Sequence, residues 1–132
     1  SGKLFTNSPS VAYLDSIGGS TTDGIATEVE TTGPVGDFYR FNWTNANALC
    51  ATYNTQNVGG RSNWRLAERD ELKVELFDRF GNMLTARGWP TLITYWSVTA
   101  RGSVYYLVNV GKGIVTVTEP SRGVYASCVS NP

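Results

Sequence analysis

The sequence predicts an α+β domain in which two helices precede an antiparallel sheet and long loops join the elements. Apolar residues recur at spacings of three and four in residues 43–53 and 68–80. Four β-branched or aromatic runs then occupy residues 94–129, with Gly- or Pro-containing turns between them. A chain of 132 residues with 41% hydrophobic content supports one independent core and is too short for two ordinary domains. We therefore expect a single domain over residues 1–132.

Residues 1–36 are rich in Ser, Thr and Gly, with turn signals at Gly18-Gly19, Asp23-Gly24 and Gly33-Pro34. A short apolar run, Val11-Ala12-Tyr13-Leu14, interrupts this composition. The pattern predicts long loops around one or two short strands. The better strand candidate is Phe38-Tyr39-Arg40-Phe41, at the start of the expected core, residues 37–130.

The first predicted helix runs from Trp43 to Tyr53. Its apolar residues share one helical face and are Trp43, Ala46, Leu49, Cys50 and Tyr53. Asn42 precedes this run and is a residue type that caps helix N-termini through its side-chain oxygen. We therefore expect the helix to begin directly after Asn42.

The second predicted helix runs from Glu68 to Phe80 and stops at Gly81-Asn82. Its apolar stripe consists of Leu72, Leu76, Phe77 and Phe80. Carboxylates concentrate in its first half and alternate with Arg and Lys side chains. A metal or acid/base site is one interpretation of such a cluster, but the alternating charges favour a solvated, ion-paired helix face.

The last third predicts strands at Thr94–Val98, Ser103–Val110, Gly113–Thr118 and Val124–Val129. Residues Asn109 to Gly113 predict a tight hairpin, because Gly111 and Gly113 can both supply positive φ angles.

Two cysteines and no histidine restrict the chemistry of the chain. Most zinc sites need four Cys or His ligands, and imidazole bases need His. We therefore expect no metal, no cofactor and no enzymatic activity. The cysteines could remain reduced thiols, or Cys50 could pair with Cys128, which would imply an oxidising compartment. No run of eighteen apolar residues occurs, so we expect no membrane span in this sequence.

Eleven basic and eleven acidic residues cancel, which argues against a nucleic-acid partner. The charges are unevenly distributed, because residues 87–132 hold four cations against Glu119 alone. Arg and aromatic side chains dominate binding energies at protein interfaces, so we take as candidate binding residues Arg87, Trp89, Arg101, Tyr105, Tyr106, Lys112 and Arg122. Tyr125 has the same chemistry. Ordinary solvated charges are the alternative explanation, and strand alternation predicts that either Tyr105 or Tyr106 belongs to the core.

An ordered set of motifs then resembles a known family. The set is Trp43-x-x-Ala46-x-x-x-Cys50, Gly60-Arg61-x-x-Trp64-Arg65-Leu66-Ala67-x-x-Asp70-Glu71-Leu72, Gly88-Trp89-Pro90, Tyr95-Trp96-Ser97 and Tyr125-x-x-Cys128. It is similar to the C-type lectin-like domain that ends bacterial intimin and invasin adhesins. The resemblance covers residues 37–130. It implies a disulfide joining the first helix to the last strand through Cys50 and Cys128. It also implies preceding immunoglobulin-like domains and a place at the extracellular tip of an outer-membrane-anchored protein.

The sequence departs from the calcium-dependent lectins of this fold. Glu119-Pro120-Ser121 resembles part of their calcium and sugar signature, but Ser121 replaces a ligand and no carboxylates converge on the turn. The resemblance therefore implies a module that recognises a host protein without calcium, such as an integrin-like receptor or an immunoglobulin. The alternative is a lectin module that stacks a glycan on Trp89 or a neighbouring tyrosine.

Overall fold

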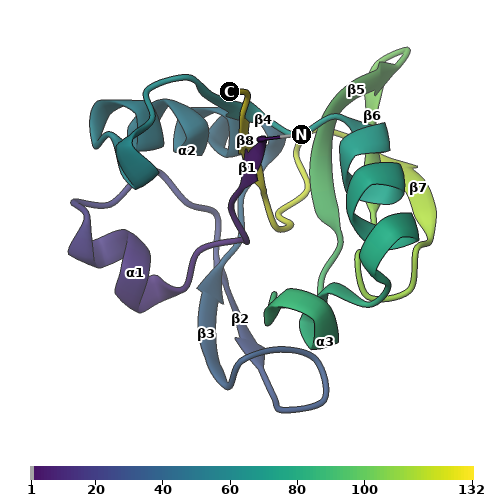
Figure 1. Cartoon of the computed structure of the whole chain (residues 1–132). Coiled ribbons are helices and arrows are strands. Elements are labelled where there is room, and N and C mark those ends of the chain that lie inside the picture. The colour runs from purple at the N-terminus through teal and green to yellow at the C-terminus, as the bar shows by residue number, and fades with distance from the viewer. Residues whose placement is uncertain (1) are drawn as a thin grey trace.

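The computed structural model describes residues 2–132 (Figure 1). Its elements, in chain order, are β1 (Leu4–Phe5), α1 (Val11–Ser16), β2 (Ile25–Glu28), β3 (Gly36–Tyr39), α2 (Trp43–Thr55), a 3₁₀ turn η1 (Val58–Gly60), β4 (Trp64–Leu66), a π-helix η2 (Glu71–Asp78), α3 (Met83–Arg87), β5 (Tyr95–Arg101), β6 (Val104–Val108), β7 (Val115–Thr118) and β8 (Cys128–Ser130). The chain thus combines helices with antiparallel strands, and the predicted α+β class is confirmed.

Three small antiparallel sheets make up the β-structure, with the orders β1-β8-β4, β2-β3 and β5-β6-β7. The last strand, β8, lies between the first strand and β4, with Leu4 opposite Ser130 and Leu66 opposite Cys128. The two ends of the chain consequently lie side by side, as Figure 1 shows.

The β5-β6-β7 sheet separates two apolar clusters. Trp96 and its cross-strand partner Leu107 belong to the cluster that contains the buried residues of α2. Tyr95 and its partner Val108 face the opposite way, into the cluster that contains Leu72 of η2. Because successive strand residues point to opposite faces, one sheet serves both clusters. Helical segments therefore cover both of its faces.

The first predicted helix is confirmed as α2. Asn42 caps it, since its side-chain oxygen accepts a hydrogen bond from the Asn45 backbone N–H at 2.8 Å. Its buried residues include Leu49, Cys50 and Tyr53, as the apolar spacing predicts.

The second predicted helix is also present, and its central part is η2. Leu72 and Leu76 are buried as expected, whereas Phe80 is 39% exposed. The expectation for Phe80 was wrong because a π-helix has more residues per turn than an α-helix. A stripe spaced for an α-helix therefore rotates out of the core at its C-terminal end.

The N-terminal part contains one element that the sequence prediction missed. The apolar run Val11–Leu14 lies in the short helix α1 and not in a strand or loop. The Ser10 side chain caps this helix by accepting a hydrogen bond from the Tyr13 N–H at 3.0 Å, and Leu14 is fully buried. One turn with a single buried residue is too short to produce a helical periodicity.

The last predicted strand is shorter than expected, because β8 begins only at Cys128. The preceding residues make isolated bridges instead: Val124 pairs with Phe41, and Tyr125 pairs with Tyr95. The chain thereby links separate sheets before it enters β8.

In the predicted hairpin between β6 and β7, the Gly113 N–H donates to the Asn109 carbonyl at 2.7 Å. Of Gly111 and Gly113, only Gly113 has a positive φ. The expectation of a positive φ at Gly111 was wrong.

The disulfide between Cys50 and Cys128 is confirmed and joins α2 to β8 across a sequence separation of 78 residues. The two half-cystines are 3% and 0% exposed. No helix within residues 2–132 is long and apolar enough to cross a membrane.

Candidate functional site

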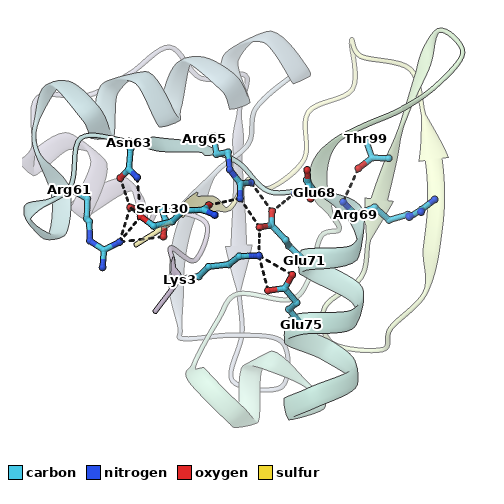
Figure 2. Close-up of polar contacts among 11 residues, drawn as sticks. Lys3, Arg61, Asn63, Arg65, Glu68, Arg69, Glu71, Glu75, Thr99 and Ser130 are labelled. Carbon is cyan, nitrogen blue, oxygen red and sulfur yellow. Dashed lines mark hydrogen bonds and ion pairs between the residues drawn. The ribbon is translucent and has the colours of Figure 1, made fainter. Parts of the chain in front are cut away.

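A partly buried ion-pair network, centred on the buried Glu71, joins the start of the chain to η2 (Figure 2). Arg65 donates two parallel hydrogen bonds to the Glu71 carboxylate, at 2.8 and 2.7 Å. Lys3 reaches the same carboxylate at 2.9 Å and binds Glu75 at 3.0 Å. The Glu68 backbone N–H adds a fourth contact to Glu71 at 2.8 Å. The network fixes the position of β1 beside η2.

This acidic cluster is ion-paired, as its alternating charges predict, but the prediction of a solvated Glu71 was wrong. The Glu71 side chain is 1% exposed. Burial by itself raises the pKa of Glu71, but the hydrogen bonds from Arg65, the Glu68 N–H and Lys3 outweigh it and lower the pKa to about 2. Glu71 is therefore a fixed negative charge whose hydrogen-bonding capacity is already used by these partners.

A groove with a volume of about 550 Å³ lies between β1, η2 and α3, and we call it the helix groove. Its apolar lining includes Phe5, Leu76, Met83 and Trp89. Leu76, Met83 and Trp89 belong to the second core cluster, so the groove opens directly onto the core. Lys3 and Glu75 of the ion-pair network lie on one side of it.

Two arginines and one aromatic ring line another side of the helix groove. The guanidinium of Arg79 lies 5.1 Å from the Phe80 ring centroid, and that of Arg87 lies 4.7 Å from it. Arg87 is in the last turn of α3, which ends at Gly88 with a φ of 71°. Neither arginine forms an ion pair with any of the residues that the structure describes. Both remain able to receive an anionic group.

Two of the predicted aromatic residues belong to the core. Trp89 is 6% exposed and its ring lies 5.5 Å from that of Tyr95. Tyr125 is fully buried and donates its hydroxyl proton to Glu28 at 2.5 Å. The candidate binding residue Trp89 therefore belongs to the second core cluster, and it also lines the helix groove.

Tyr105 and Tyr106 lie on opposite faces of β6, and both are half-buried. Tyr105 stacks on Trp43 with ring centroids 4.0 Å apart. The Arg69 guanidinium lies over the Tyr106 ring, with its central carbon 4.6 Å from the ring centroid. The sequence predicted one core tyrosine and one exposed tyrosine. The structure differs because helical segments cover both faces of the sheet.

The predicted cations separate to opposite ends of the β5-β6-β7 sheet. Arg101 pairs with Val104 at the tip of the β5-β6 hairpin, which projects from the molecule in Figure 1. Lys112 lies in the β6-β7 turn at the other end, next to α3, because the Val110 carbonyl accepts a hydrogen bond from the Met83 N–H at 3.0 Å. The predicted residues therefore do not form one patch.

Arg122 lies at the same end of the sheet as Arg101. It follows β7, whose last residue Thr118 pairs with Tyr105. Arg101, Arg122 and Lys112 are exposed, and none has an ion-pair partner within residues 2–132. We call the residues at the β5-β6 end of the sheet the hairpin end. They are Arg101, Tyr105, Tyr106 and Arg122.

The sequence prediction missed Arg79, Phe80 and Val74 of the helix groove. Val74 is 51% exposed although it is an apolar residue of a packed helix. The available signal was the adjacency of Arg79 and Phe80 at the helix end, but nothing in the sequence indicated that Arg87 folds back over the same ring. Within residues 2–132, no three His, Cys, Asp or Glu side chains gather where they could hold a metal ion.

The fold, with α2 tied to the last strand by a disulfide and antiparallel sheets between helical layers, defines a C-type lectin-like domain. The chain belongs to the Lcl C-terminal domain family, whose model matches residues 20–130. Among solved structures, the Yersinia pseudotuberculosis adhesin InvE matches with a TM-score of 0.70 and 20% sequence identity. That match covers 98% of this chain and 32% of the InvE chain, so the chain spans about a third of its length. No curated protein matches significantly.

Proposed function

We propose that this domain is a non-enzymatic binding module of a bacterial surface adhesin and that it recognises a host protein without calcium. The observation that carries the proposal is the fold that almost the whole chain shares with the adhesin InvE. Because the chain corresponds to about a third of that protein, the proposal includes further domains before it, immunoglobulin-like in the simplest case, and an outer-membrane anchor. The receptor would be a protein of the host cell surface or a secreted protein such as an immunoglobulin.

The hairpin end is the surface that we assign to the host protein. Arg101 and Arg122 are exposed and free of internal ion pairs, so they can form bidentate contacts with carboxylates of a partner. Tyr105 and Tyr106 are held in place by Trp43 and Arg69, so little rotamer entropy is lost when they are covered. Tyr and Arg are residue types that are enriched in interface hot spots, and each face of β6 contributes one of the two tyrosines to this end of the sheet.

The glycan-binding alternative depended on an exposed aromatic platform. Trp89 is 6% exposed and cannot stack against a sugar without leaving the core. The neighbouring tyrosines have one ring face already covered. Protein recognition is therefore the better supported proposal.

The proposal is tested by binding the purified domain to human epithelial cells in buffer containing EDTA. We expect binding to survive EDTA and enzymatic removal of glycans and to disappear after proteinase treatment of the cells. Substituting both Arg101→Gln and Arg122→Gln should weaken binding about tenfold or more, as loss of hot-spot residues does. Lys112→Gln, an exposed cation at the other end of the sheet, is the matched control. Loss of binding in EDTA or after deglycosylation would refute the proposal.

A further inference from the structure

The geometry of the helix groove points to a second interaction surface. We propose that it binds a peptide segment of a partner protein in which an acidic side chain stands beside a bulky apolar one. This inference rests on the proposed function only in taking the ligand to be a protein. It concerns residues of β1, η2 and α3, and α3 contacts the β6-β7 turn, at the other end of the sheet from the β5-β6 hairpin.

The apolar part of the ligand is indicated by the bottom of the helix groove. Leu76, Met83 and Trp89 line it and are between 0% and 6% exposed. At its edge, Val74 is 51% exposed and Phe80 is 39% exposed. These two side chains leave apolar surface in water that a docked apolar side chain would cover. A volume of about 550 Å³ accommodates such a side chain together with its neighbours.

The acidic part of the ligand is indicated by the charges around the groove. Lys3, Arg79 and Arg87 line it, against Glu75 alone. Lys3 is engaged by Glu71 and Glu75. Arg79 and Arg87 each lie over the Phe80 ring, and neither has an ion-pair partner among residues 2–132. A guanidinium whose flat face lies on an aromatic ring still has free N–H donors along its edge. These donors can form two parallel hydrogen bonds to one carboxylate.

The wall formed by β1 favours a peptide over other anions with an apolar portion. Among the described strands, β1 is the edge of its sheet, since β8 pairs with it on one side only. Edge strands present backbone donors and acceptors to an extended segment. Such a segment could direct an apolar side chain toward Trp89 and an acidic one toward Arg79 and Arg87.

The test is selection of displayed random heptapeptides on the immobilised domain. We expect enriched sequences to carry Asp or Glu within two positions of Leu, Ile, Phe or Trp. Enrichment should fall at least tenfold on the Arg79→Gln/Arg87→Gln variant and remain unchanged on Lys112→Gln. Val74→Glu is a second variant that leaves both arginines in place. It should also reject acidic peptides, because it adds a negative charge at the edge of the groove.

Several results would overturn the inference. One is the absence of enrichment on the unmodified domain, and another is enrichment of peptides without acidic residues. The inference would also be overturned if the Arg79→Gln/Arg87→Gln variant and the Val74→Glu variant both bound the same peptides as the unmodified domain. A concentration-dependent dimer dissolved by Arg79→Gln/Arg87→Gln would identify a second copy of the chain as the occupant. The selection uses no host cells, so its outcome is separate from that of the cell-binding experiment.

Discussion

The Glu71 carboxylate connects local hydrogen bonding to the pH dependence of folding. Its pKa is about 2 in the folded protein and close to 4.3 in an unfolded chain. A depressed pKa stabilises the fold above the unfolded value, and this stabilisation is lost as the pH falls from about 5 to 2. For a side chain that is 1% exposed, the contribution is on the order of 3 kcal/mol. Glu71→Gln should lower the free energy of unfolding at pH 7 and flatten its decline below pH 5, as measured by urea denaturation at several pH values.

Glu68→Gln is the matched control for this prediction at the residue scale. Glu68 lies three positions earlier and is exposed, and its contact to the network is made by its backbone N–H. Its substitution should therefore leave both the stability at neutral pH and the acid profile within about 0.5 kcal/mol of the original protein. Equal acid profiles for Glu71→Gln and the unsubstituted protein would show that the ion pairs of Glu71 do not stabilise the fold.

At the scale of elements, Gly113 couples the β6-β7 turn to η2. A Cβ atom at this position would lie 2.4 Å from the Phe77 ring, and the backbone φ is +78°. Gly113→Ala should therefore cost the left-handed penalty of about 1 to 2 kcal/mol and about 1 to 3 kcal/mol more for displacing the ring. Gly102→Ala is the control, because Gly102 has a φ of +62° with nothing within 4 Å. Thermal unfolding of both variants separates the two costs, and equal losses would show that the turn does not pack on η2.

The same elements show which features a sequence can predict. α2 was predicted well because it has a capping residue and three turns of regular apolar spacing. η2 was predicted in position but not in the orientation of Phe80, because the apolar spacing predicts an α-helix and no local signal indicated the wider π-helical turn. The helix groove was not predictable at all. It depends on how β1, η2 and α3 approach each other, and no local pattern encodes that arrangement.

At the scale of the whole molecule, two kinds of link meet at β8: strand pairing with β1 and β4, and the disulfide to α2. β8 pairs with β1 on one side and β4 on the other, which brings the two ends together. Cys128 at the start of β8 is bonded to Cys50 in α2, on the α2 side of the core. The helix groove is lined by residues of β1, η2 and α3, and the hairpin end lies on the β5-β6-β7 sheet, so neither half-cystine is among the residues proposed for binding. The disulfide should therefore govern stability and leave the binding surfaces intact.

The last prediction follows from that separation. Cross-linking a loop of 78 residues stabilises a fold by about 4 to 5 kcal/mol in the chain-entropy model. Replacing both half-cystines, with Cys50→Ala and Cys128→Ala, should lower the free energy of unfolding by an amount of this order, as measured in urea. Reduced original protein should unfold at nearly the same urea concentration as the variant, since both lack the cross-link. Below its unfolding transition, the variant should still bind cells and select the same heptapeptides. A folded variant that has lost both activities would show that the bond positions the binding surfaces, and unchanged stability would show that β8 is held by its strand pairing alone.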